Sequence, residues 1–217
     1  MESKILELIQ NLTNINSPSG NAYNAISYVK QKVEHLGYST QLTNKGALII
    51  TVEGEDNERQ RCITAHVDTL GAMVKEIKED GRLTIDLIGG FKYNAIEGEY
   101  CQIETDSGET YTGTICLHET SVHVYRENEK IPRDIEHMEV RIDEKTTSKQ
   151  ETEGLGIEVG NFISFDPRTE ITSSGFIKSR HLDDKASVAM ILDLLERIKN
   201  EQIKLPHTIQ FYISNNE

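Results

Sequence analysis

The sequence predicts an α/β fold in which a twisted sheet flanked by helices is interrupted by an inserted, small β-barrel domain. Helical and strand-forming segments occur together at both ends of the chain, which is typical of an α/β layer. The middle of the chain instead holds short strand-like segments separated by turn signals, as in small barrels and sandwiches. We therefore expect residues 1–70 and 167–217 to form an α/β domain, incomplete at its second part, around an inserted β-rich domain at residues 71–166.

The N-terminal part carries two helical patterns and then two strand patterns. Residues 4–12 place their apolar side chains on one helical face, as the helical period requires. A second helix follows the break at SPSGN and ends near Gly37, where glycine suits the left-handed residue that closes a helix. Strands are predicted over residues 46–54 and 61–69, with the charged turn EDNERQ between them.

The middle part alternates short β-rich segments with turns such as DG and SG. One further segment, TTSKQETEGLGI at residues 146–157, favours a short helical turn. Six segments are predicted to be strands: MVKEI, RLTIDLIG, EYCQIET, TYTGTICL, SVHVY and MEVRI.

Helical periodicity returns near the C-terminus. Residues 181–200 carry one apolar stripe, with Asp183 and Asp184 near its start. Residues 207–214 are predicted to be a strand, and the chain stops three residues later at Glu217. A strand that finishes on polar residues usually leads to another element of the sheet, so we expect a truncated α/β unit.

Composition excludes several classes of function. The formal net charge of -13 argues against nucleic acid or an anionic membrane as a partner, because both require a basic face. No apolar run reaches the roughly 18 residues of a membrane span, and the N-terminus lacks the uninterrupted apolar core of a signal peptide. We therefore expect a cytoplasmic protein. Its three cysteines, Cys62, Cys101 and Cys116, are predicted to be buried, reduced thiols.

His66 and Asp68 form the first candidate site. Residues two apart on a strand point to the same face, and ligands of α/β sheets bind outside the carboxyl ends of the strands. An imidazole there can bind a divalent metal, and a carboxylate on the same face can orient it. Taken alone, the pair could equally be a histidine and an aspartate on the surface.

Asp183, Asp184 and Glu217 extend this candidate site. Adjacent aspartates at a helix start can be simple capping residues, or one of them can bridge two cations. A single glutamate after a strand carries little information by itself. Together, however, His66, Asp68, Asp183 and Glu217 supply the side chains that a two-metal hydrolase takes from successive elements of a sheet.

These segments carry a specific resemblance. ITAHVDTLGAMV, GFIKSRHLDDKASVAMIL and FYISNNE resemble the successive active-site segments of the M42 (glutamyl aminopeptidase-like) family of metallo-aminopeptidases. The resemblance implies a zinc-peptidase-like α/β domain interrupted by a small β-domain. The sequence departs from the family pattern at Lys185, where the family often has arginine, and at Asn161, where it has aspartate.

The resemblance also implies a role for each candidate residue. His66 resembles a metal-ligating histidine, Asp68 the aspartate that holds it in place, and Asp183 the aspartate that bridges two divalent ions, zinc or cobalt. Glu217 resembles the glutamate that acts as general base. The family's following ligands do not occur in these 217 residues, so we expect the chain to lack a complete active site. His118, His123 and His181 are expected to be non-catalytic.

The implied activity is removal of N-terminal residues from peptides by a metal-activated water, in an enzyme that self-associates into a homo-oligomer. Peptide substrates and other copies of the chain are therefore the expected partners, without nucleic acid or membrane. Two alternatives stay open at this point. One is a metal hydrolase of non-peptide substrates, such as an N-acyl compound or a glycoside, and the other is a catalytically silent assembly or binding protein.

Overall fold

The computed structural model describes residues 2–217, with the side chains described from Lys4. Internal contacts divide the chain into two compact units. One unit combines residues 1–69 with residues 167–217, and the other holds residues 70–166. The first unit contains every residue of the candidate site.

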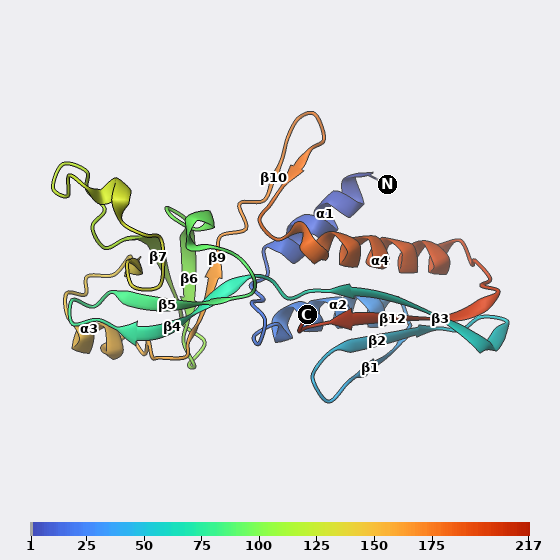
Figure 1. The fold of residues 1–217 in the computed structure, drawn as a ribbon. Helices are drawn as coiled ribbons and strands as arrows, with labels where there is room; N and C mark the ends of the chain where they lie inside the picture. The colour runs from blue at the N-terminus through green and yellow to red at the C-terminus, as the bar shows by residue number, and fades with distance from the viewer. Residues whose placement is uncertain (1) are drawn as a thin grey trace. The chain divides into compact units, whose positions relative to one another are not determined.

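The first unit is a mixed sheet packed with helices (Figure 1). Its sheet has the strand order β1-β2-β12-β3, and a separate two-stranded ribbon pairs β10 with β11. The elements are α1 Glu2–Thr13, α2 Tyr23–His35, β1 Ser39–Leu42, β2 Leu48–Val52, β3 Asp56–His66, β10 Glu170–Ile171, β11 Ile177–Lys178, α4 Leu182–Asn200 and β12 His207–Ser214.

One face of this sheet carries the core. Alternate residues of β2 are buried, namely Leu48, Ile50 and Val52, as are Phe211 and Ile213 of β12. Since alternate residues of a strand share a face, these side chains all point to the same side. They form a single apolar cluster with the buried residues of α1, α2 and α4.

The strand pairing determines where the site lies. β12 runs antiparallel to β2 but parallel to β3, with Ser214 opposite His66. Two parallel neighbours end at the same edge of the sheet, so the residues after Ser214 and those after His66 emerge together. This edge is the expected ligand-binding position in an α/β sheet.

The second unit is a closed six-stranded barrel with the strand order β4-β5-β8-β7-β6-β9. It has its own core, in which Ile85, Ile103 and Ile163 are fully buried. The elements are β4 Gly71–Ile77, β5 Leu83–Ile88, η1 Tyr93–Ala95, β6 Tyr100–Glu104, β7 Thr110–Leu117, η2 Asn128–Lys130, β8 Met138–Ile142, α3 Lys149–Gly154 and β9 Phe162–Phe165.

Three details of the sequence-based prediction are wrong. SVHVY is not a strand: Val122 and Val124 are 60% and 69% exposed, and β9 closes the barrel instead. EDNERQ is not only a turn, because β3 already begins at Asp56. Cys62 is exposed, because most residues of β3 lie on the surface. In the described part of the chain, no helix is long and apolar enough to cross a bilayer.

An ion cluster surrounds the buried Glu139 in the barrel. Glu139 is 1% exposed, and its carboxylate accepts hydrogen bonds from Lys78 Nζ at 2.8 Å and from Arg82 Nη1. His118 Nδ1 lies 3.0 Å from the same carboxylate. Burial alone would raise the pKa of Glu139, but the hydrogen bonds from Lys78 and Arg82 outweigh it, and the pKa is lowered.

Glu139→Gln is therefore expected to destabilise the barrel. At pH 7 the free energy of unfolding should fall by about 1.5–3 kcal/mol, the range for hydrogen bonds to a charged group. Because the folded pKa is lowered, this contribution is present above the unfolded pKa of about 4.3 and is lost as the pH falls through the folded pKa. Urea unfolding at neutral and acid pH measures both effects. The exposed Glu144, changed to glutamine, is the control; an equal loss there would refute the role of the cluster.

Candidate active site

His66 is the last residue of β3. Asp68 contacts one of its two ring nitrogens, Nδ1. Nδ1 lies 3.0 Å from the backbone oxygen of Asp68 and 3.4 Å from Asp68 Oδ1. The opposite nitrogen, Nε2, lies 3.3 Å from Asp183 Oδ1 and 3.3 Å from Glu217 Oε2. A histidine that donates from Nδ1 to oxygen keeps the Nε2 lone pair for a ligand, and here Nε2 faces two carboxylates.

Asp68 connects three chain segments. It is 2% exposed, and its Oδ2 accepts hydrogen bonds from Ser19 Oγ at 2.5 Å and from the backbone N–H of Glu217 at 3.1 Å. Its Oδ1 is buried and accepts no hydrogen bond from any described residue, so that oxygen is left facing His66 Nδ1. The carboxylate thus connects the loop before α2, the end of β3 and Glu217, three residues after β12.

The two aspartates at the start of α4 have different positions. Both have non-helical backbone angles, so regular helical geometry begins at Lys185. The peptide bond between them is cis. Asp183 is 94% exposed at its side chain and reaches His66 Nε2. Asp184 Oδ2 accepts a hydrogen bond from the backbone N–H of His66 at 3.3 Å, which joins the start of α4 to the end of β3.

Lys185 lies fully buried beneath the site. Its Nζ donates a hydrogen bond to the backbone oxygen of Ile15 at 2.6 Å. Burial lowers the pKa of this ammonium to about 7, and the negative charge of Asp68 opposes that change. A lysine with these contacts joins α4 to the same loop that carries Ser19.

The donor set at this edge fits a divalent cation. The His66 ring nitrogen lies near the carboxylates of Asp183 and Glu217, whose side chains are mostly exposed, so an incoming ion can reach them. Histidine and carboxylate ligands suit zinc and other first-row metals. Among residues 2–217, however, no three or more histidine, cysteine, aspartate or glutamate side chains form a ready ligand group. The cluster presents a partial set of ligands.

The structure brings His66, Asp68, Asp183 and Glu217 together, although 117 positions separate the histidine from Asp183. Ser19 and Lys185 join this arrangement without a signal in the sequence. SPSGN indicates only a break between helices, and Lys185 stands out only as a departure from the family pattern. No sequence periodicity indicates that either side chain lies near Asp68.

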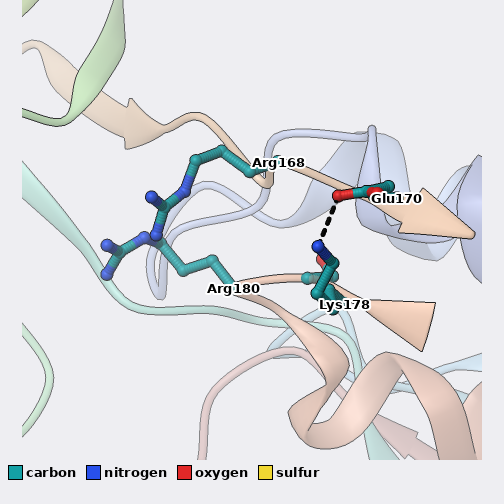
Figure 2. A pocket seen from close by; sticks show the side chains of 5 residues that line it. Arg168, Glu170, Lys178 and Arg180 are labelled. Atoms are coloured by element: carbon teal, nitrogen blue, oxygen red, sulfur yellow. Dashed lines mark ion pairs between the residues drawn. The ribbon is translucent and has the colours of Figure 1, made fainter. Parts of the chain in front are cut away.

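A separate pocket lies beside the β10–β11 ribbon (Figure 2). It encloses about 540 Å³ and is lined by Arg168, Glu170, Lys178, Ser179 and Arg180. Lys178 and Glu170 form an ion pair of 2.6 Å across the ribbon. None of these lining residues belongs to the His66 cluster, so this pocket is not the candidate active site.

The family model described as M42 glutamyl aminopeptidase matches residues 46–217. The chain belongs to this family. It is 61% identical to YhfE of Bacillus subtilis (strain 168), which is provisionally named an aminopeptidase, over 214 residues that make up 99% of this chain and 62% of YhfE. The resemblance seen at the three active-site segments is thereby confirmed.

Solved structures share the fold. An aminopeptidase from the archaeon Desulfurococcus kamchatkensis matches with a TM-score of 0.87 and 24% identity, over 98% of this chain and 56% of that one. The Pyrococcus horikoshii TET1 peptidase, which can assemble into a tetrahedron or a large octahedral shell, matches with a TM-score of 0.81 and 21% identity, over 97% of this chain and 60% of that one. The chain thus spans about 56–62% of the length of these three proteins.

Proposed function

We propose that this protein is a metal-dependent aminopeptidase that removes N-terminal residues from peptides. The observation that carries the proposal is the position of His66 Nε2, which lies 3.3 Å from both Asp183 Oδ1 and Glu217 Oε2. These side chains come from β3, from the start of α4 and from the residues after β12. Membership of the M42 family supports peptides over the N-acyl compounds or glycosides that a similar site could cleave.

We assign the side chains as follows. His66 and Asp183 would hold the two divalent cations, zinc or cobalt. When bound, these cations would polarise the scissile carbonyl and activate a water molecule. Glu217 would take the proton from the attacking water and return it to the leaving amine, as a general base and then a general acid. Asp68 would keep the His66 ring in its orientation.

The proposal extends to domain organisation, assembly and location. We propose that residues 71–166 are a barrel domain inserted into the α/β domain. We also propose that the protein self-associates, because the Pyrococcus horikoshii TET1 peptidase, which shares its fold, assembles into a tetrahedron or an octahedral shell. The proposed location is the cytoplasm, where free thiols such as those of Cys62, Cys101 and Cys116 persist.

A panel of aminoacyl anilides and short peptides tests the function. The complete protein should release N-terminal residues, lose this activity with a chelator and regain it with zinc, cobalt or manganese. Peptides with a blocked amino terminus should stay intact. Turnover of N-acyl compounds or glycosides without turnover of any peptide would move the assignment to a non-peptide hydrolase. If the protein turned over none of these substrates, the result would favour a non-catalytic assembly or binding protein.

A further inference from the structure

The loop between α1 and α2 pairs with the chain just after β3. Pro18 and Thr69 form an isolated parallel β-bridge. The backbone N–H of Thr69 donates to the oxygen of Ser17 at 2.8 Å, and the N–H of Ser19 donates to the oxygen of Thr69 at 3.2 Å. Residues 17–19 are the first three of the SPSGN break. Besides separating two helices, this segment therefore lies along the residues that follow β3.

The two serines of this segment donate to different acceptors. The buried Ser17 Oγ donates to the backbone oxygen of Val67 at 2.8 Å, so it reinforces the backbone pairing. Ser19 Oγ donates instead to the carboxylate of Asp68, with 2.5 Å between Ser19 Oγ and Asp68 Oδ2. Of the two hydroxyls, that of Ser19 contacts a residue of the proposed active site.

The carboxylate that Ser19 contacts also supports two other residues of the site. Asp68 Oδ2 accepts the backbone N–H of Glu217 at 3.1 Å, and Asp68 Oδ1 lies 3.4 Å from Nδ1 of His66. Without the Ser19 hydroxyl, the N–H of Glu217 would be the one donor left to Oδ2 among residues 2–217. Asp68 is 2% exposed, so water has little access to replace the lost bond. A turn of this carboxylate would change its contacts with both His66 and Glu217.

The backbone pairing does not require a hydroxyl at position 19. It uses the N–H of Ser19, which every residue except proline can supply. The Ser19 side chain is also only partly buried, so filling the core does not explain it. What serine adds at this position is the hydrogen bond to Asp68.

We propose that Ser19 is a positioning residue, whose hydroxyl holds the Asp68 carboxylate in the orientation that supports the His66 ring and the backbone of Glu217. Ser19 acts through Asp68 and takes no part in the reaction itself. The effect of Ser19 on catalysis rests on the proposed function. Its effect on metal binding is independent of the substrate.

Three variants of Ser19 in the complete protein test the proposal. Ser19→Ala removes the hydroxyl, and Ser19→Thr and Ser19→Val form a pair of equal shape that differ in the hydroxyl. In protein stripped of metal, the affinity for Co²⁺ should fall by about 10-fold in Ser19→Ala and Ser19→Val, the lower end of the usual effect of losing a group that supports a metal ligand. Ser19→Thr should recover most of this affinity. At saturating Co²⁺, kcat for an aminoacyl anilide should stay reduced in the alanine and valine variants, with little change in KM.

The matched control is Ser17→Ala, which removes the other serine hydroxyl of the same segment. It takes the hydrogen bond from the backbone oxygen of Val67 and leaves the contacts of Asp68 in place. Because a buried acceptor loses its donor, the melting temperature should fall. The Co²⁺ affinity should stay near that of the wild type.

A double-mutant cycle with Asp68→Ala tests the route. If Ser19 acts through Asp68, adding Ser19→Ala to Asp68→Ala should lower the Co²⁺ affinity by no more than about twofold further. Fully additive losses would mean that Ser19 acts on the metal site by another route, and would overturn the proposal.

The remaining results separate this proposal from the proposed function. Wild-type affinity in both Ser19→Ala and Ser19→Val would overturn the positioning role. A loss in Ser19→Thr as large as in Ser19→Val, or an equal loss in Ser17→Ala, would also overturn it, since the Ser19 hydroxyl would then have no special part. If the wild-type protein binds Co²⁺ with the expected dependence on Ser19 but cleaves no peptide, the positioning role stands and the aminopeptidase assignment fails.

Discussion

Replacing Glu217 by glutamine is expected to lower turnover by about 10²–10⁴-fold, the usual contribution of a general acid–base group. The glutamine keeps the size and hydrogen-bonding reach of the side chain but cannot accept the proton of the attacking water. The backbone N–H of Glu217 still donates to Asp68, so the variant should fold normally. Metal content should stay near that of the wild type, because His66 and Asp183 are unchanged. Steady-state kinetics together with metal analysis measures both quantities.

Glu53 offers a matched control for this variant. It is an exposed glutamate just beyond β2 in the same unit, and Glu53→Gln removes the same charge away from the site. Its kcat should equal that of the wild type. A Glu217→Gln enzyme as fast as the Glu53→Gln enzyme would remove Glu217 from the mechanism. A loss of both metal and activity would instead make Glu217 a ligand.

Replacing Asp183 by asparagine is expected to abolish activity together with metal binding. Asp183 Oδ1 lies 3.3 Å from His66 Nε2, and a bridging role requires two charged carboxylate oxygens. An amide offers one neutral oxygen, so one cation would lose its ligand, the other would keep only a neutral one, and the pair would lose a negative charge. Calorimetry with Zn²⁺ on metal-stripped protein should show at least one binding event lost, and excess metal in the assay should restore little of the rate.

Asp193 lies further along the same helix, within the regular part of α4, and Asp193→Asn is the control for this change. Its metal content and turnover should be unchanged. Normal metal content in Asp183→Asn would contradict the bridging assignment, whatever the effect on rate. The two site variants thus predict different outcomes: Glu217→Gln retains metal and loses rate, whereas Asp183→Asn loses both.

Regular elements could be predicted best where one periodicity persists along the chain. TYTGTICL, MEVRI and HTIQFYIS are strands with the predicted bounds, because apolar residues alternate along each. SVHVY has the same alternation, but no strand among residues 2–217 pairs with it and its valines stay exposed. FISF shows a nearly continuous apolar run without alternation, yet it is a strand that pairs with both β4 and β6. Whether SVHVY and FISF form strands depends on pairing across the barrel. Local sequence does not predict that pairing.

For the site too, local sequence predicts which residues are candidates but not which contacts they make. Residue type and order point to His66, Asp68, Asp183 and Glu217, because these residues follow strands or precede a helix. Their convergence depends on the parallel pairing of β12 with β3, which brings residues 66 and 214 together at one edge. The hydrogen bond from Ser19 to Asp68 and the burial of Lys185 depend on how the loop before α2 packs, so neither could be predicted from local sequence.

A crystal structure of the complete protein grown with Zn²⁺ or Co²⁺ tests the proposed metal site most directly, since anomalous scattering identifies each ion. We predict an ion about 2.0–2.2 Å from His66 Nε2 and from an Asp183 oxygen, with Asp183 shared between two ions and Glu217 close to the water they activate. Ions bound elsewhere, with His66 and Asp183 outside their coordination, would contradict the assignment of this site.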